Sequence, residues 1–341
     1  MIRASRITVT AVATTLLAAC GPQEEIDLSR MVDHHVHLLS PGLVADWKST
    51  GVNFSRADSF YTSAGPLLDE SAGRRPLAGA VLLPMAHLYG SASFRQSLRL
   101  GLAAERAAVQ RENDHVAAEA ARYPGRAVAF CGVDFLRPYA WDELRRCQTE
   151  LNSPGIKLHL GSARANLRNS GHLATLAGIV AWARAENLVV MLHFDPQSRE
   201  ASQADVQRFI AQVLEPRPDL VMVIAHLGGS GGYGPWTRVV YRTMAEWLDA
   251  EAAAGRPRPG IFFDISAAWL AQDSDEVPRS TRQDGEALAA DLAAHGVGRL
   301  LFGSDSPVFD PAPYGAAFKR AAGLTQAAWD SLAANRVPGF P

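Results

Sequence analysis

The chain has 341 residues, of which 48% are hydrophobic and 20% are charged, and its formal net charge is -2. This composition supports a large buried core, and it excludes the strongly basic surface that is typical of proteins that bind nucleic acid. The length exceeds a usual domain of about 150 residues, but a single α/β barrel often uses about 250 residues or more.

The first thirty residues have the layout of a secretory signal. Arg3 and Arg6 precede an apolar stretch from Ile7 to Ala19, and Cys20 follows it. Because a helix needs about 20 apolar residues to cross a bilayer, this stretch favours a cleaved signal over a permanent anchor. The end of the stretch, Leu-Ala-Ala-Cys, resembles the lipobox of bacterial lipoproteins, which implies cleavage of residues 1–19 and lipidation of Cys20.

We therefore expect an exported protein that is held on a membrane through Cys20, with residues 20–29 as a tether, and that faces the periplasm or the cell surface. An ordinary cleaved signal is the alternative. Cys131 and Cys147 are the other two cysteines, and the sequence leaves open whether they form a disulfide.

Downstream of residue 30, apolar segments of strand length alternate with amphipathic segments of helix length. The predicted strands are Met31–His37, Leu77–Pro84, Arg126–Phe135, Gly155–Leu160, Leu188–Phe194, Leu220–His226, Gly260–Ile265 and Arg299–Ser304. The predicted helices are Leu100–Tyr123, Trp141–Leu151, His172–Glu186, Ala201–Leu214, Trp236–Ala254 and Gly285–His295. This alternation predicts a (β/α)₈ TIM barrel over residues 30–341.

Residues 46–75 are polar and show no clear periodicity, so we interpret them as an insertion after the first strand that could cover the site as a lid. The aromatic residues in it could roof a pocket or pack the insertion down.

Histidines gather at the predicted strand ends, where the active site of such a barrel lies. His35 and His37 alternate along the first strand and share one face, while His193 and His226 end the fifth and sixth strands. Asp305 follows the last strand. Histidine and carboxylate are the ligands of catalytic zinc sites, so the combination predicts a metal centre, although each residue alone could be structural.

The order of these motifs resembles the amidohydrolase superfamily, specifically the amidohydrolase-related group that includes aminocarboxymuconate-semialdehyde decarboxylase. The matching segments are Asp33–His37, Glu112–Asp114, Arg126, Gly155–His159, Met191–His193, Ile224–Gly229 and Leu301–Asp305. The resemblance covers roughly residues 30 to 341. It implies that His35, His37, His193 and Asp305 bind one divalent metal, most simply Zn²⁺.

The same resemblance implies that His226 is an acid or base beside the metal, and that Asp305 also accepts a proton from water. Lys157 and His159 share a face of the fourth strand and are expected near the substrate. A second metal, bridged by a carboxylated Lys157 as in binuclear members, is the less favoured alternative. Arg164 and Arg168 could hold a substrate carboxylate, or they could be solvated surface charges.

We expect an enzyme that acts on a small molecule, and hydrolysis of an amide, ester or lactone by metal-activated water is the first expectation. Non-oxidative decarboxylation of an unsaturated or aromatic carboxylate on the same site is the second. A non-catalytic zinc-binding lipoprotein is the third. A homodimer is compatible with the sequence, and the glycine-rich segment 228–234 is expected to be a mobile active-site loop rather than a phosphate cradle.

Overall fold

The computed structural model describes residues 26–69, 76–195, 202–273 and 277–340. Residues 1–25, which carry the predicted signal and Cys20, therefore lie outside the described residues. Within the described ranges, no helix combines the length and apolar character that crossing a bilayer requires.

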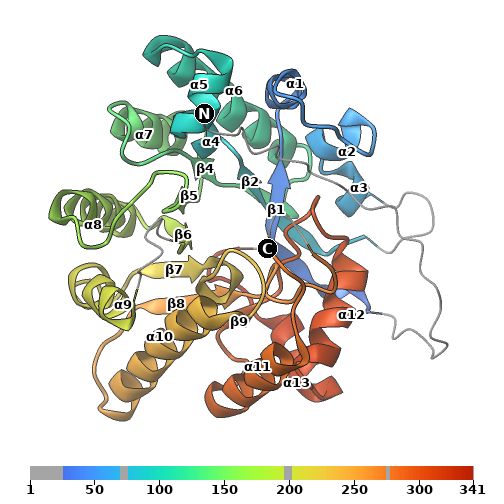
Figure 1. The fold of residues 1–341 in the computed structure, drawn as a ribbon, viewed down its shortest axis with the longest axis vertical. Helices are drawn as coiled ribbons and strands as arrows, with labels where there is room; N and C mark the ends of the chain where they lie inside the picture. The colour runs from blue at the N-terminus through green and yellow to red at the C-terminus, as the bar shows by residue number, and fades with distance from the viewer. Residues whose placement is uncertain (1–25, 70–75, 196–201, 274–276, 341) are drawn as a thin grey trace, which may run out of the picture.

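Parallel strands form an inner ring, and helices surround it (Figure 1). The strands are β1 Val32–Leu38, β2 Gly79–Pro84, β3 Ala127–Ala129, β4 Cys131–Gly132, β5 Gly155–His159, β6 Val189–His193, β7 Val221–Ile224, β8 Gly260–Asp264 and β9 Leu300–Leu301. The α-helices are α1 Pro41–Ser49, α2 Asp58–Thr62, α3 Gly65–Leu68, α4 His87–Gly90, α5 Ala92–Leu98, α6 Leu102–Ala121, α7 Ala140–Glu150, α8 Ser170–Ala185, α9 Gln203–Phe209, α10 Pro235–Ala253, α11 Arg282–His295, α12 Pro311–Ala321 and α13 Gln326–Ala334. Shorter turns are η1 Leu28–Arg30, the π-helical turn η2 Ile210–Leu214 and η3 Ala225–Gly228.

Two runs of parallel strands, β1-β2-β3 and β4 to β9, join into the predicted barrel. The backbone N–H of Phe130, between β3 and β4, donates to Leu82 O at 3.0 Å, so these two short strands continue one barrel strand. At the other seam, His34 N donates to Phe302 O at 2.9 Å, and Asp305 N donates to His35 O at 2.9 Å. These hydrogen bonds tie the last strand to the first.

Most sequence-based element boundaries are confirmed to within a few residues, but the predicted strand Arg299–Ser304 is shortened to Leu300–Leu301, and two other strands differ. The predicted strand Arg126–Phe135 is divided at Phe130, whose ring packs in the barrel interior 5.5 Å from the ring of Phe340. The predicted strand Leu220–His226 ends at Ile224, because His226 has a φ of 55° and leaves the extended conformation. A positive φ at a residue other than glycine interrupts strand pairing.

In the predicted insertion 46–75, the described residues 46–69 contain the end of α1 and the whole of α2 and α3, which is more regular structure than the sequence pattern indicates. Ser40 caps α1, because its Oγ accepts a hydrogen bond from Leu43 N at 3.1 Å, and Pro41 follows at the first helical position. Phe54 packs 4.7 Å from the ring of Tyr61, which is buried. These contacts favour the packing role of the insertion's aromatic residues.

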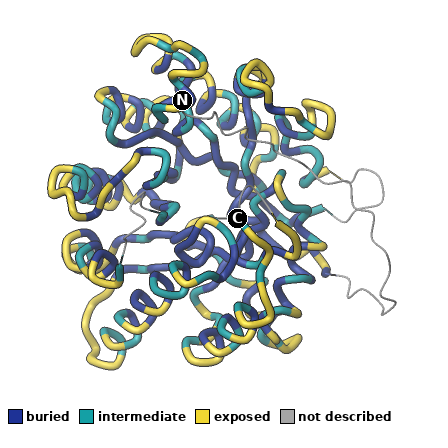
Figure 2. The backbone as a smooth tube through the Cα atoms, in the orientation of Figure 1, coloured by how far each residue is buried: buried dark blue, intermediate teal, exposed yellow. Residues whose placement is uncertain are grey.

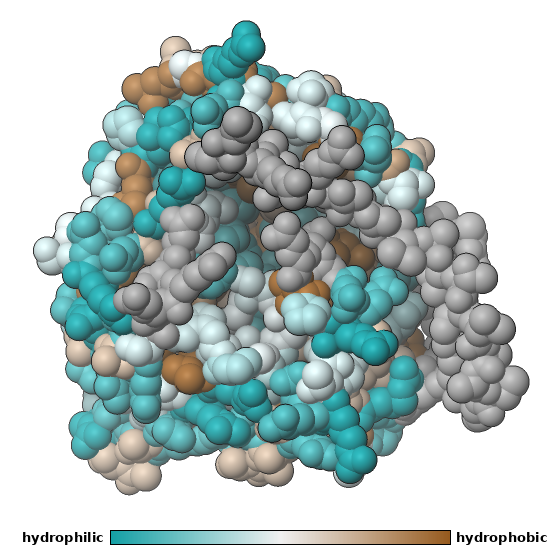
Figure 3. Space-filling view, viewed as in Figure 1, coloured by the Kyte–Doolittle hydropathy of each residue, from teal (hydrophilic) through white to brown (hydrophobic). Residues whose placement is uncertain are grey.

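The core has two parts. A large cluster fills the space between strands and helices, where the tube in Figure 2 is dark blue on its inward side and yellow toward the periphery. A smaller cluster fills the barrel interior and contains Val81, Leu83, Phe130, Val189, Met191, Val223, Leu301 and Val337. Val337 and Phe340 show that the C-terminal segment closes one end of the interior. On the face shown in Figure 3, hydrophilic residues dominate the outer helices and hydrophobic ones are scattered in small groups.

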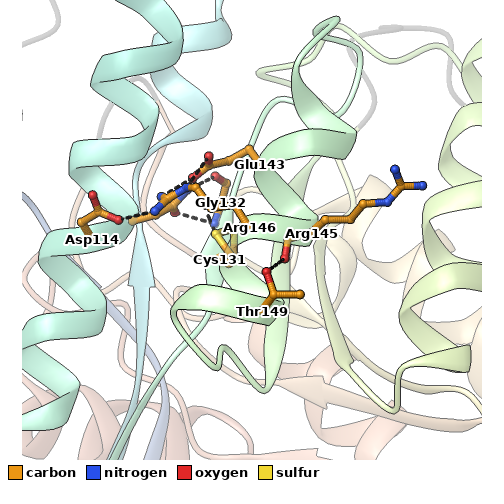
Figure 4. The surroundings of a disulfide bond; sticks show 9 residues. Asp114, Cys131, Gly132, Glu143, Arg145, Arg146 and Thr149 are labelled. Atoms are coloured by element: carbon orange, nitrogen blue, oxygen red, sulfur yellow. Dashed lines mark hydrogen bonds and ion pairs between the residues drawn. A yellow bond between two sulfur atoms is a disulfide. The ribbon is translucent and has the colours of Figure 1, made fainter.

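The disulfide that the sequence left open is present. Cys131 of β4 and Cys147 of α7 are bonded, with 6.0 Å between their Cα atoms, and both are fully buried (Figure 4). The bond pins α7 to the third barrel strand. Beside it, Glu143 of α7 accepts hydrogen bonds from Asn113 and Arg146.

Candidate metal centre

Every residue that the sequence assigned to the site lies at the carboxyl end of a barrel strand. His35 and His37 lie in β1, Lys157 and His159 end β5, His193 ends β6, His226 follows β7 in η3, and Asp305 follows β9. The structure adds Asp264 at the end of β8 and His87 at the start of α4, after β2. Both were missed. Asp264 is a strand-end carboxylate, so the same rule that identified Asp305 could have found it.

Three electron-rich atoms converge at the centre of this group. His35 Nε2 lies 3.1 Å from His37 Nε2, and each nitrogen lies 3.4 Å from Asp305 Oδ1. The other ring nitrogens are occupied, since His35 Nδ1 lies 2.9 Å from Asp264 Oδ2 and His37 Nδ1 lies 3.3 Å from Leu83 O. Both partners are acceptors, so each Nδ1 carries the proton and each Nε2 presents a lone pair.

This donor triangle fits a divalent metal. Four ligands at about 2.0 to 2.1 Å around tetrahedral zinc are separated from one another by roughly 3.3 Å, which matches the observed spacing. Burial and the nearby Lys157 lower the pKa of His35 to about 4, and burial and His35 lower the pKa of His37 further below its usual range. Neutral imidazoles and a carboxylate, placed in contact, are the donor set that a metal ion requires.

His226 extends the group. The metal-binding atoms of three residues, His35, His226 and Asp305, lie within 4.8 Å of one another. His226, Leu227 and Gly228 have φ values of 55°, 53° and 97°, so the chain makes a left-handed turn directly after β7. A side chain at position 228 would bring its Cβ to 2.3 Å from Val240 Cγ1, so this turn requires glycine.

Asp264 connects the two histidines. One carboxylate oxygen contacts His35 Nδ1, and the other accepts a hydrogen bond from His226 N at 3.0 Å. Ser266 adds a hydrogen bond from its backbone N–H, and its carbonyl oxygen lies 2.9 Å from His226 Nδ1. Burial raises the pKa of Asp264, but its contacts with His35 and His226 outweigh this effect and hold the pKa well below its usual value. Asp264 is thus an ionised group that orients the donors.

His193, at the end of β6, contacts the glycine-rich loop and two other histidines. Its Nε2 lies 3.2 Å from Ser230 Oγ in the glycine-rich loop, and that hydroxyl donates to Asp195. Its ring stacks on His159 with 3.8 Å between centroids and lies 4.6 Å from the ring of His226. The ring of His226 thus contacts the rings of both His35 and His193, with 4.6 Å between centroids in each pair.

Lys157 lies against the triangle. It is buried, its Nζ is 3.2 Å from His35 Nε2, and burial lowers its pKa to about 8. His159 accepts a hydrogen bond from Ser162 N at its Nδ1, at 3.2 Å. His87 is buried next to His159, with 4.9 Å between ring centroids. Burial, followed by the charge of Lys157, lowers the pKa of His87 to about 3.

The two arginines considered for substrate binding differ from these groups. Arg168 forms a bidentate ion pair with Asp205, at 3.0 Å for each contact, and its side chain is 44% exposed. Arg164 is exposed. Both observations favour the surface role.

Several solved structures share this fold. A 2,6-dihydroxybenzoate decarboxylase from Rhizobium matches with a TM-score of 0.53 at 15% identity, covering 89% of this chain and 95% of its own. A dihydroxybenzoic acid decarboxylase from Polaromonas sp. JS666, with bound manganese and 2-nitroresorcinol, matches with a TM-score of 0.53 at 14% identity, covering 89% and 94%. An amidohydrolase from Burkholderia multivorans with bound HEPES matches with a TM-score of 0.50 at 19% identity, covering 91% and 99%.

At these identities the likeness concerns the fold. Among curated protein sequences, none matches this chain. The sequence does match the amidohydrolase family over residues 32–333, which spans the whole barrel from β1 to α13 and includes every residue of the candidate metal centre. This protein is therefore an enzyme of the amidohydrolase family.

Proposed function

We propose that this enzyme is a metal-dependent, non-oxidative decarboxylase of an aromatic or unsaturated carboxylate. The observation that carries the proposal is the donor triangle of His35, His37 and Asp305, with His226 within 4.8 Å of two of its members. Structures of the same fold named as decarboxylases, one with manganese, support the choice of reaction. His193 is the proposed fourth ligand, and Zn²⁺ is the proposed metal.

When bound, the metal supplies a Lewis acid that stabilises negative charge on a substrate oxygen. In the reaction the bond between the substrate carbon and its carboxylate breaks, CO₂ leaves, and the electron pair that remains on carbon takes up a proton. His226 is placed to deliver that proton. Because Ser266 O holds the proton on Nδ1 at 2.9 Å, Nε2 is the nitrogen that gains and releases the transferred proton.

Lys157 and His159 are the proposed substrate-binding residues. The buried Lys157 ammonium adds positive charge beside the metal ligands, where an anionic substrate must approach. Burial removes the ammonium group from water and so destabilises its charged form. An anionic substrate bound beside it would stabilise that form.

Hydrolysis is the second candidate, because the same triangle can hold metal-activated water. Asp305 has 16% of its side chain exposed, and it is therefore reachable as an acceptor of the water proton. In that case an amide, ester or lactone would be the substrate.

One experiment separates these reactions. The full chain is loaded with Zn²⁺ or Mn²⁺, its metal content is measured, and it is incubated with hydroxybenzoates, unsaturated carboxylates, esters, lactones and amides. Release of CO₂ with a product lighter by that mass supports the decarboxylase. A product heavier by one water supports the hydrolase instead. Stoichiometric metal without turnover of any of these compounds would contradict both proposed reactions for these substrate classes.

We also propose that the protein is exported and anchored through Cys20. The buried disulfide between Cys131 and Cys147 supports export, because such bonds persist mainly in oxidising compartments. In cells that express the full chain, the wild type should fractionate with membranes, and Cys20→Ala should lose membrane attachment. A Cys20→Ala protein that remains on the membrane would contradict the lipid anchor.

A further inference from the structure

We infer that His87 is a substrate-binding residue and that, together with His159, it forms an imidazole pair that binds the carboxylate group of the substrate. The inference rests on the proposed function and names the side of the pocket where the reacting carboxylate lies. His87 was not among the residues that the sequence assigned to the site.

The first observation is an unsatisfied polar atom. His87 is 2% exposed, and its Nδ1 has no hydrogen-bond partner among the described residues. Buried imidazole nitrogens in folded proteins are normally hydrogen-bonded, because a buried donor or acceptor without a partner destabilises the fold. A bound ligand at the mouth of the barrel explains why this nitrogen is left free.

The second observation is the position of the ring. His87 follows β2 at the carboxyl end of the barrel, and it packs against His159 with the two rings tilted by 34°. His159 accepts a hydrogen bond at Nδ1, so its neutral ring carries the proton on Nε2 and can donate it. Ring centroids 4.9 Å apart allow one carboxylate to accept a hydrogen bond from each ring.

The third observation is the charge around the pair. Besides burial, the positive charge of Lys157 lowers the pKa values of both His87 and His159. Its Nζ also contacts His35 of the donor triangle. An anion at the imidazole pair would therefore experience the positive charge of the Lys157 ammonium, which itself contacts the donor triangle. Arg168, a possible competitor for this role, is bound to Asp205 at the surface.

Uncharged donors also suit this chemistry. During decarboxylation the carboxylate loses its negative charge as CO₂ forms, so a rigid ion pair to it would stabilise the ground state more than the transition state. Neutral imidazole N–H groups orient the carboxylate with a smaller penalty of this kind.

The test measures binding, so it does not require turnover. Full-length protein, loaded with Zn²⁺ and labelled with ¹⁵N in its histidines, is titrated with benzoate and with phenol, which has the same ring without the carboxylate. Benzoate should shift the ring signals of His87 and His159, which are assigned by their loss in His87→Gln and His159→Gln. Phenol should leave these signals unchanged.

Variants give the magnitude. His87→Phe should weaken benzoate binding about ten-fold, the loss expected for one hydrogen bond to a charged group, and should leave the metal content unchanged. His172→Phe is the matched control, because His172 lies near the start of α8, where its Nδ1 accepts a hydrogen bond from Asn166 N. This control should bind benzoate as the wild type does.

Equal benzoate affinities for His87→Phe and the wild type, with both proteins folded and metal-loaded, would overturn the inference. So would the absence of any benzoate binding to the wild type. The proposed function is judged separately by CO₂ release. If CO₂ is released but benzoate does not shift the His87 signal, the proposed function stands and only this inference fails.

Discussion

Two buried polar clusters differ in how their polar atoms are paired: one lies around β4 and α7, and the other lies at the carboxyl ends of the barrel strands. In the structural cluster (Figure 4), Asn113 donates to Gly132 O and to Glu143, and accepts from Gly132 N, while Arg146 forms a bidentate pair with Glu143. Each acceptor faces a donor. In the histidine cluster, two imidazole lone pairs and the Asp305 carboxylate face one another.

The difference indicates which cluster stabilises the fold and which binds a ligand. A satisfied network holds neighbouring elements together, and here it joins α6, β4 and α7 around the disulfide. The histidine cluster contains several acceptors but one cation, the Lys157 ammonium 3.2 Å from His35. It can therefore bind another cation. Mutations in the two clusters should therefore separate stability from activity.

The largest effect is expected in the donor triangle. The double variant His35→Ala with Asp305→Ala should lose its bound metal and reduce turnover by about 10³-fold or more, because the Lewis acid contributes several kcal/mol to the barrier. Metal content by mass spectrometry and turnover on the substrate found in the screen are the measurements. Retention of stoichiometric metal would show that the triangle is not the metal site.

The structural cluster should give the opposite result. Glu143→Ala leaves Asn113 and Arg146 without their shared partner, so the free energy of unfolding should fall by about 2 to 4 kcal/mol. Turnover per folded molecule should stay within about two-fold. Asp114→Asn is the control, since Asp114 contacts the same Arg146 from an exposed position, and it should change stability by less than about 1 kcal/mol. A large loss of activity in Glu143→Ala would erase the distinction between the clusters.

Asp264 differs from the rest of the histidine cluster, because its two carboxylate oxygens already have hydrogen-bond partners in His35 and His226. Asp264→Asn should weaken metal binding by about 10- to 100-fold, since it disturbs the orientation and basicity of His35. Asp249→Asn is a matched control, because Asp249 contacts His295 Nδ1 at 2.8 Å far from the triangle. Competition with a fluorescent chelator measures both affinities. Equal affinities in the two variants would remove Asp264 from the metal centre.

The smallest effect is a pH dependence of stability. The pKa of His87 falls from an ordinary 6.5 to about 3 on folding, so the unfolded chain binds more protons below pH 6.5. Stability is therefore lost as the pH falls through this window, by about 2 kcal/mol at pH 5. In the metal-free protein, urea unfolding at pH 7 and pH 5 should show this loss for wild type relative to His87→Phe. Asp33 and Glu112, whose pKa values are raised to about 7, are present in both proteins. Their contributions to the pH dependence therefore cancel when the two proteins are compared. Parallel behaviour of the two proteins would exclude this contribution.

Local patterns in the sequence predicted much of this protein. Strand-length apolar runs alternating with helical segments gave the barrel, because parallel strands buried on both faces must be apolar throughout. Period-two alternation placed His35 and His37 on one face. The rule that barrel sites form at strand ends then brought His226 and Asp305, distant in sequence, to the same region.

Tertiary contacts decided the rest. The disulfide between Cys131 and Cys147 required the Cα separation of 6.0 Å, which no spacing in the sequence reveals. Asp264 became a partner of His35 across 229 residues, and His193 contacts Ser230 of the glycine-rich loop. His87 lies beside His159, after a strand end that the histidine pattern did not mark. The sequence determined which residues reach the mouth of the barrel, because backbone periodicity is local. The tertiary structure determined which atoms meet there, because hydrogen bonds between loops depend on how the strands close.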